Sequence, residues 1–412
     1  MISRRVVLSM GLALVGAPRR SASGALPTIT ATNGDAAVGE AVLTLPLPRG
    51  LVGESFILRD DDGQAIVTEV LRDRSLAFVV QAMTPREVRR FTLEPALDRR
   101  DPPPLVARGV DDGVELAIDG ERVVTYRTQR APSIVDPVPP GLGRGGYLHP
   151  LLSPEGRVVS GDDAPERPEQ RGLWSAWGAS TFDGRRPDFW HTGAGTGSVE
   201  FEGVQRAWSG TIVAGFEASH RSVDRSARPP VTAETDRWRV TLPALGRVGR
   251  RYRALDLEWR HEAATAKPLV VAPGAYGSLG WRGPRTWRGA TGMAVLTADG
   301  RGRSSASRTR PRWIAMVGLV GGRNAGVALL DHPDNPRYPQ PVYVDSLQPF
   351  VSVAPMQLGP ITVARGRDVV LRCRVVTFDG FPDRAWLEAL WQAYAHPPRT
   401  VIDWRPSPSG VP

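Results

Sequence analysis

The stretch VELAIDGERVVTY (residues 114–126) decides the fold class of this chain, because it has the pattern of two short β-strands joined by a tight turn. Strand-forming residues flank Asp119-Gly120, and an Asp-Gly pair between two such runs is a strong signal for a β-hairpin. The stretch therefore predicts antiparallel β structure in this part of the chain.

Short strand-like runs recur through the other residues, separated by clusters of turn-forming residues. The 44 glycines and 38 prolines together make about a fifth of the 412 residues, which favours many short strands over long helices. Apolar residues at convincing helical spacing occur only in residues 383–395, where Asp383 can cap the helix start. We predict a mainly β fold with one C-terminal α-helix.

The pattern of strands and prolines divides the chain into five parts. Residues 27–100 are expected to form a small N-terminal β-sandwich, and residues 106–396 a larger antiparallel β-sandwich. Residues 101–105 contain three consecutive prolines and are interpreted as a stiff linker. Residues 1–25 are interpreted as a signal peptide and residues 397–412 as a tail.

The charge pattern argues against a nucleic-acid partner. The formal net charge is +9, but arginines are spread along the chain and interleaved with Asp and Glu instead of forming one basic stripe. A polyanionic substrate such as an acidic glycan is the alternative explanation for the positive charge. The single cysteine, Cys373, excludes an intrachain disulfide and is expected to be a buried structural thiol.

The N-terminal residues have the order of a secretory signal. Arg4-Arg5 precedes an apolar run over residues 6–17, and small residues follow at 21–25. The adjacent arginines are typical of the twin-arginine type. The apolar run of about 12 residues is shorter than the roughly 20 needed to span a bilayer. We expect a periplasmic or extracellular protein without membrane insertion.

Five stretches are richer in polar and aromatic side chains than ordinary strands require. They are YLHPL (147–151), RGLWSAWG (171–178), DFWH (188–191), YGSLGWR (276–282) and DHPDNPRYP (331–339). Side chains of this kind on loops between strands are typical of binding and catalytic sites.

In this order, the five stretches resemble the PmoA-like family of secreted bacterial proteins over about Val106 to Ala395. The most specific matches are His149-Pro150-Leu151, Arg171-Gly172-Leu173-Trp174, Asp188-Phe189-Trp190 and Asp331-His332-Pro333. The family is often labelled "methane oxygenase", but its function is essentially unassigned. A membrane oxygenase subunit needs several spanning helices, and none is expected here. By analogy of fold alone, the larger sandwich is compared with the galactose-mutarotase supersandwich.

The chain departs from the family pattern just before Arg171. Family members place an adjacent His pair there, whereas this chain has Glu169-Gln170. If the pair binds a metal or transfers protons, Glu169 can replace one histidine because a carboxylate can do either, but Gln170 cannot titrate. We therefore expect neither a bound metal nor another cofactor.

The resemblance and the residue types together give a candidate site. Asp331, His332 and Glu169 are the candidate acid–base groups. The expected substrate-binding residues, which offer hydrogen bonds or aromatic faces to a polyhydroxylated ligand, are His149, Arg171, Trp174, Asp188, Trp190, His191, Tyr276, Arg282, Asn335 and Arg337. Residues 331–337 and 171–174 are predicted to line one pocket, because a β-sandwich brings distant loops together.

Three functions remain open from the sequence. The first is an exported carbohydrate-active enzyme, the second a non-catalytic sugar- or polymer-binding protein, and the third a metal-dependent oxidoreductase. Each motif also has a structural alternative: Asp331-His332-Pro333 can be a turn, Trp174 and Trp190 can be core residues, and the arginines can form surface ion pairs. The sequence gives no basis for an oligomeric state.

The export hypothesis predicts that changing both Arg4 and Arg5 to Lys traps the precursor in the cytoplasm, because twin-arginine recognition depends on the arginine pair. The measurement is fractionation of cells that express either the original or the doubly substituted precursor. Normal export of the double variant would contradict the twin-arginine assignment.

Overall fold

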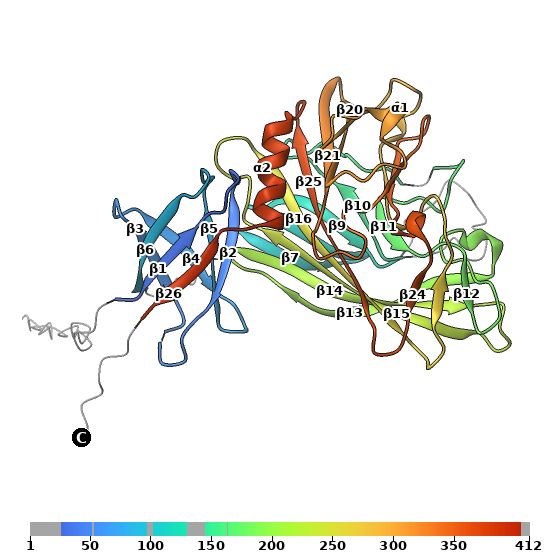
Figure 1. Ribbon diagram of the computed structural model, residues 1–412, viewed down its shortest axis with the longest axis horizontal. Helices are drawn as coiled ribbons and strands as arrows, with labels where there is room; N and C mark the ends of the chain where they lie inside the picture. Colours follow the sequence, from blue (N-terminus) through green and yellow to red (C-terminus); the bar gives the residue numbers. More distant parts are fainter. Residues whose placement is uncertain (1–25, 52, 97–101, 130–144, 163, 405–412) are drawn as a thin grey trace, which may run out of the picture.

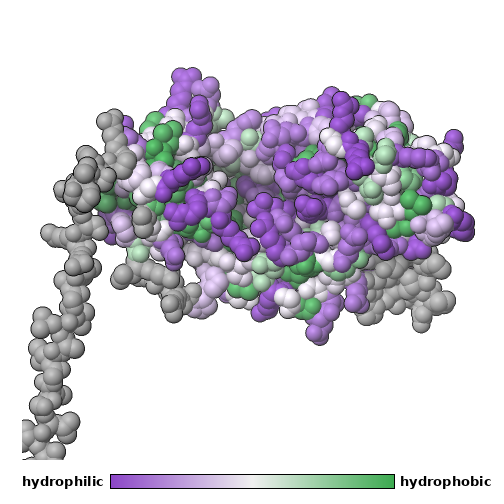
Figure 2. Space-filling view, turned by 90° about the horizontal axis from the view of Figure 1, so that it is seen from below, coloured by the Kyte–Doolittle hydropathy of each residue, from purple (hydrophilic) through white to green (hydrophobic). Residues whose placement is uncertain are grey.

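The computed structural model describes residues 26–51, 53–96, 102–129, 145–162 and 164–404. These residues form four antiparallel sheets, and the expected mainly β fold is confirmed. The face seen in Figure 2 is largely hydrophilic, with small apolar areas between the polar side chains.

The N-terminal part of the chain forms a seven-stranded sheet, called the small sheet below. Its strands, in spatial order, are β2 (Ala41–Pro46), β5 (Ser75–Val80), β4 (Ala65–Val70), β3 (Phe56–Asp60), β6 (Val88–Pro95), β1 (Thr28–Thr32) and β26 (Arg399–Asp403). The sheet curls over its own core of buried side chains such as Ile29, Leu43 and Phe78, so that the end strands β2 and β26 also come into contact.

The interpretation of residues 397–412 as a tail is wrong for residues 399–403. Strand β26 pairs antiparallel with β1, from Thr28 opposite Asp403 to Thr32 opposite Arg399. Strand β26 thus lies at one end of the sheet that also contains β1, the first described strand (Figure 1). Residues 405–412 lie outside the described residues, as does the proposed signal peptide.

Two eight-stranded sheets pack face to face and form the large sandwich. The first contains, in order, β22 (Val342–Val344), β23 (Phe350–Val353), β18 (Ser278–Arg282), β11 (Leu173–Ala176), β10 (Tyr147–Leu151), β9 (Glu121–Arg127), β8 (Gly113–Ile118) and β7 (Leu105–Val110). The second contains β13 (Gly197–Trp208), β14 (Val213–Asp224), β15 (Val231–Pro243), β16 (Tyr252–Ala263), β25 (Val369–Asp379), β21 (Arg323–Asp331), β20 (Trp313–Val320) and β19 (Ala294–Thr297).

The core of the large sandwich lies between these sheets. Tyr126 of β9 meets Phe216 and Trp238 of the opposite sheet, with ring centroids 4.8 Å and 6.0 Å apart. The predicted hairpin over residues 114–126 is confirmed as β8 and β9, with Asp119 and Gly120 both in the left-handed conformation that such a tight turn requires.

Shorter elements complete the large sandwich. A three-stranded sheet contains β12 (Ser180–Phe182), β17 (Leu269–Val271) and β24 (Ile361–Val363). The helices are α1 (Arg303–Ala306), α2 (Arg384–Ala395) and the 3-10 turns η1 (Thr192–Ala194), η2 (Arg285–Trp287) and η3 (Pro355–Leu358). The predicted C-terminal helix is confirmed as α2, and Asp383 caps it by accepting a hydrogen bond from the Trp386 N–H at 2.7 Å.

Helix α2 lies between the small sheet and the large sandwich (Figure 1). Its Leu387, Leu390 and Trp391 pack on the outer face of the second large sheet, while Ala393 packs into the core of the small sheet. On another side, the Glu69 carboxylate accepts hydrogen bonds from the backbone of Ile212 at 2.7 Å. The proposed linker over residues 101–105 is thus not the only connection between the small sheet and the large sandwich, because side-chain contacts and strand β26 also join them.

Truncation after His396 should destabilise the protein by at least about 3 kcal/mol, because it removes β26 and exposes the backbone and the buried Ile29 edge of β1. Chemical denaturation of the truncated and full-length proteins measures the difference. Truncation after Trp404 keeps β26 and is the matched control. Equal stability after loss of β26 would show that the strand contributes little.

Candidate active site

A pocket of about 220 Å³ opens beside the three-stranded sheet. Its polar lining comes from Asp188 and His191, which follow β12, and from Tyr276, which precedes β18. The rest of the wall comes from residues 178–179 and 271–275 and from Met356 of η3. Three of the predicted substrate-binding residues are therefore together in one pocket.

Asp188, His191 and Tyr276 form a continuous hydrogen-bonded chain. The Asp188 Oδ1 accepts the backbone N–H groups of Trp190 and His191 at 2.9 Å and 2.8 Å, which fixes a tight turn. Its Oδ2 lies 2.9 Å from His191 Nδ1, and His191 Nε2 lies 3.1 Å from the Tyr276 hydroxyl. Because an ionised carboxylate only accepts, Nδ1 carries the hydrogen, and Nε2 accepts from the Tyr276 hydroxyl when the ring is neutral.

The electrostatic surroundings favour the charged form of His191. The hydrogen bond that His191 donates to Asp188 raises the pKa of His191, and partial burial only reduces this effect. Burial alone would raise the pKa of Asp188, but the bonds from the His191 ring and backbone outweigh it, so the Asp188 pKa lies below its usual range. The His191 side chain is 46% exposed, so solvent and a ligand both reach it.

Aromatic rings form the wall behind this chain. Trp190 packs against Trp174 and Tyr276, with ring centroids 4.9 Å and 5.9 Å away, and Tyr276 lies 5.2 Å from Tyr343. Trp174 and Trp190 are almost fully buried, as core residues are. They support the pocket from behind, whereas Tyr276 is only partly buried and lines the pocket.

A loop over residues 161–172 carries two charges that act on His191. Its Glu169 raises the pKa of His191 by charge attraction, while Arg167 acts in the opposite direction. Arg282 anchors the loop: its buried guanidinium donates to Gln170 Oε1 and Glu166 Oε1, both at 2.8 Å. The predicted ligand residue Arg282 therefore positions this loop, because its hydrogen bonds go to protein side chains.

Arg171 and His149 form a separate group on the other side of this loop. Arg171 donates to the Tyr147 hydroxyl at 3.2 Å and pairs with Asp162 at 3.1 Å, and its side chain is 1% exposed. Burial lowers the pKa of His149 to about 4, against the attraction of Asp162. Within the described residues, this group supports the base of the loop.

The structure gives Asp331 a structural role. Its carboxylate accepts hydrogen bonds from the backbone of His332 and Gln340 and from the Asn335 amide, at 3.0, 2.7 and 2.6 Å. Asn335 also bridges to the backbone of Arg372 in both directions. Burial raises the pKa of Asp331 to about 6, although these bonds oppose the rise. Asp331 and Asn335 thus stabilise a turn, which is the structural role that the sequence offered as an alternative to catalysis.

The predicted pocket shared by residues 331–337 and 171–174 is not supported. His332 packs edge-on against Tyr394 of α2, and Arg337 donates to the carbonyl oxygens of Pro355, Gly359 and Pro360. Arg171 has its partners on β10 and in the loop. The physical reason is that the two segments bind to different parts of the protein, so we leave Asp331, His332, Asn335 and Arg337 out of the candidate site.

The apolar wall of the pocket was missed by the sequence analysis. Met356 of η3 and Val271 of β17 line the pocket and lie outside the quoted motifs. They belong to the site only because distant segments meet there, and no local sequence pattern signals this.

Two buried His–carboxylate pairs lie in the core of the large sandwich. His220 pairs with Asp236 and His261 with Glu234, each at 2.8 Å, and both histidines are almost fully buried. Neighbouring strands place these groups side by side, and each pair neutralises a charge that would be costly alone. They are part of the core and do not line the pocket.

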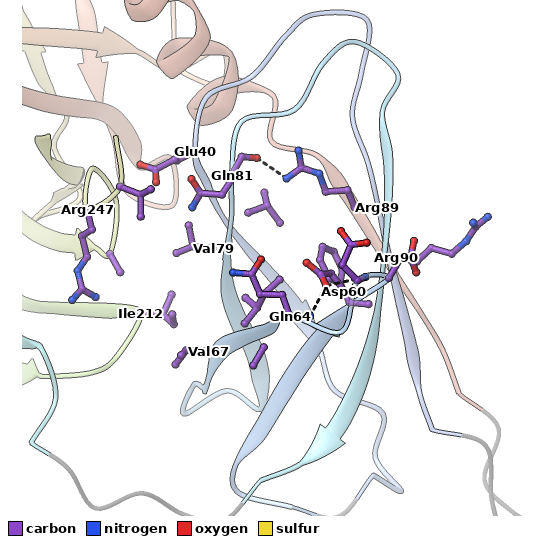
Figure 3. Close-up of a pocket in the computed structure, with 18 of the residues that line it drawn as sticks. Glu40, Asp60, Gln64, Val67, Val79, Gln81, Arg89, Arg90, Ile212 and Arg247 are labelled. Carbon is purple, nitrogen blue, oxygen red and sulfur yellow. Dashed lines mark hydrogen bonds between the residues drawn. The ribbon is translucent and has the colours of Figure 1, made fainter. Parts of the chain in front are cut away.

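A larger cleft of about 780 Å³ lies where the small sheet meets the large sandwich (Figure 3). No histidine lines it, and two of its carboxylates hold the chain in place. Glu40 accepts hydrogen bonds from Tyr252 and the Gly246 backbone, and Asp60 accepts one from the Gln64 backbone. The His191 pocket therefore remains the better candidate for chemistry.

Two further observations concern metal ions and membranes. Among the described residues, no three His, Cys, Asp or Glu side chains are grouped as metal ligands. No helix within the described ranges has both the length and the apolar character that crossing a membrane requires.

The fold and the pocket define a mainly β protein with a hydrogen-bonded series of Asp, His and Tyr side chains beside its large sandwich. The chain belongs to the family of unknown function DUF6807, whose family model matches residues 113–392. The match covers most of the large sandwich, including all three pocket residues of the hydrogen-bonded chain. A search of curated proteins found no match.

The His191 pKa should lie above its ordinary value of about 6.5, and Asp188→Asn should lower it by removing the charged hydrogen-bond partner. Stabilisation from the pair is fully present below pH 6.5 and is lost as the pH rises through the raised value. NMR titration of the imidazole protons measures both proteins, and His332, held in another loop, is the internal reference. A His191 pKa at or below 6.5 in the unsubstituted protein would contradict the pairing.

Proposed function

We propose that this chain is an exported carbohydrate-active enzyme whose His191 pocket binds one sugar unit and exchanges a proton with it. The observation that carries the proposal is the half-exposed His191 imidazole, fixed between the Asp188 carboxylate and the Tyr276 hydroxyl. A carboxylate that orients an imidazole whose other nitrogen faces a cavity is a common arrangement for general acid–base catalysis.

The shape and lining of the pocket support a sugar as the ligand. Its volume of about 220 Å³ is smaller than the roughly 300–1,000 Å³ of sites for drug-sized molecules, and so suits one small polar unit. Tyr276 offers an aromatic ring and a hydroxyl group to the pocket, which fits a ligand with an apolar face and a polar rim.

The resemblance to the PmoA-like family adds a role for Glu169. That position corresponds to one residue of the family's His pair, and in this chain its charge acts on His191. Glu169 would then stabilise the imidazolium that forms when His191 accepts a proton. We propose His191 as the proton-transferring group, Asp188 as its orienting partner and Glu169 as a second source of negative charge.

Replacing His191 by Asn should lower turnover of a sugar substrate by about 10²–10⁴-fold, because the proton-transferring group is lost while a hydrogen-bonding side chain remains. A panel of oligosaccharides and polysaccharides identifies the substrate by product analysis, and calorimetry measures binding. His396→Ala, at the end of α2, is the matched histidine control and should retain full activity.

The outcomes separate the proposed enzyme from a binding protein. Binding that persists in His191→Asn with turnover lost supports the enzyme. Sugar binding at this pocket without any turnover in the unsubstituted protein would identify a non-catalytic binding protein instead. Turnover that is unchanged in His191→Asn would show that the reaction takes place elsewhere.

A further inference from the structure

The cleft of about 780 Å³ between the small sheet and the large sandwich opens where two strands of the small sheet part. Strand β4 pairs with β5 only beyond Val67, beginning with Thr68 opposite Phe78. From Ala65 to Val67, β4 pairs with β3 alone. This stretch of β4 and the corresponding stretch of β5, which begins at Val79, both line the cleft (Figure 3).

The backbone of β4 has a free edge beside the cleft. The Asp60 N–H donates to the Gln64 carbonyl at 3.1 Å, so the backbone of Gln64 faces β3. Successive residues of a strand direct their N–H and C=O groups to opposite sides, and those of Ala65 therefore point away from β3, toward the gap. On that side the Ala65 backbone has no hydrogen-bond partner among the described residues. Such an edge is a template for another extended chain.

Aliphatic side chains from separate segments surround this edge and are exposed to solvent. Val67 of β4, Val88 of β6 and Val248 of the large sandwich all line the cleft, and all three are exposed. The aromatic residue of the lining, Phe91, is buried and presents no ring face to a ligand. Sugars stack on exposed aromatic rings, so this lining suits the aliphatic side chains of a peptide better than a glycan.

The lining of the cleft also carries an excess of negative charge. The carboxylates of residues 60–62 and of Glu40 line it, and none of the four forms an ion pair with a described residue. Arg89 and Arg247 pair with carboxylates outside the lining, at 2.6 Å and 2.9 Å. Arg90 is the one lining arginine without such a pair among the described residues. Four carboxylates against one arginine favour a cationic ligand.

We propose that the cleft binds an extended, basic segment of a partner protein. The segment pairs with the free edge of β4, places apolar side chains against the three valines, and sets a lysine or arginine beside residues 60–62. In this mode of recognition, main-chain hydrogen bonds give affinity and the contacts of alternate side chains give specificity. The volume of about 780 Å³ lies within the roughly 300–1,000 Å³ of ligand sites, so a short segment fits. The cleft shares no residue with the His191 pocket, so this proposal is independent of the proposed sugar chemistry.

The test uses a short synthetic peptide of alternating valine and threonine with two lysines at one end, called the lysine peptide. One comparison peptide has two aspartates in place of the lysines, a second has all its backbone amides methylated, and cellohexaose is the glycan arm. Calorimetry measures binding to the purified protein. We expect the lysine peptide to bind, and the other three ligands to bind at least about 10-fold more weakly.

Substitutions at the edge and at the acidic turn assign the contacts. Ala65→Pro removes the N–H to which an incoming carbonyl would bind and keeps the pairing with β3, because that N–H points away from β3. It should weaken binding of the lysine peptide by about 3–10-fold. Asp61→Asn combined with Asp62→Asn should weaken binding by a similar factor at low salt and less at high salt. Asp299→Asn, at an exposed turn of the large sandwich, is the matched control and should have no effect.

Hydrogen exchange on the unsubstituted protein tests the same edge if Ala65→Pro fails to fold. The amides of Ala65 and Val67 are on the side of β4 that an added strand would cover. The lysine peptide should slow the exchange of both amides. Unchanged exchange at both positions on saturation with the peptide would overturn the proposal.

Other outcomes also contradict the proposal. Equal binding of the aspartate peptide would refute recognition by charge, and equal binding of the methylated peptide would refute strand pairing. Preference for cellohexaose would show that the cleft is a glycan site. Dimers of the protein that the lysine peptide dissociates would identify a second copy of this chain as the occupant.

Discussion

The buried guanidinium of Arg282 links the fold to the candidate site. It extends from β18 inside the large sandwich and donates to Glu166, Gln170 and Gln348, so one side chain fastens the loop of residues 161–172 and the segment before β23. Burial lowers the pKa of Arg282, and Glu166 opposes that effect. A buried charge is tolerated only with such partners, so the loop must adopt this conformation for the sandwich to be stable.

Two kinds of polar residue therefore have different roles at the site. Arg282 and Arg171 are bound entirely within the protein and give the loop its shape, whereas His191 and Tyr276 keep part of their surface open to the pocket. The buried aromatic side chains behind His191 and Tyr276 likewise fix the shape of the turn at Asp188. Gly280 allows this close packing, because a Cβ there would meet the rings of Trp190 and Trp174 within 3 Å.

Local patterns in the sequence predicted most of the fold. The hairpin over residues 114–126 and the capped helix α2 are both encoded by neighbours a few residues apart, through alternation, turn chemistry and helical spacing. Strand β26 could not be recognised in this way, because its partner β1 is about 370 residues earlier in the chain. A five-residue alternating segment near the end of a chain has no local feature that distinguishes a strand from a tail.

The candidate site was predictable in part. Enrichment in polar and aromatic residues picked out Asp188, His191 and Tyr276, which do meet. The same criterion also picked out Asp331, because the sequence does not show whether a carboxylate is used by the backbone around it. Met356 was not picked out, because an isolated methionine gives no local sign that it lines a pocket.

The pairing of β1 with β26 also sets the order in which the molecule can be completed. The small sheet contains the first and the last of the described strands, so the ribosome must add about 370 further residues after β1 before β1 gains β26 as a neighbour. Until then, one edge of β1 has unpaired backbone groups that could pair with another chain. The large sandwich can form within a continuous segment, whereas the small sheet gains its seventh strand only after β26 has been made.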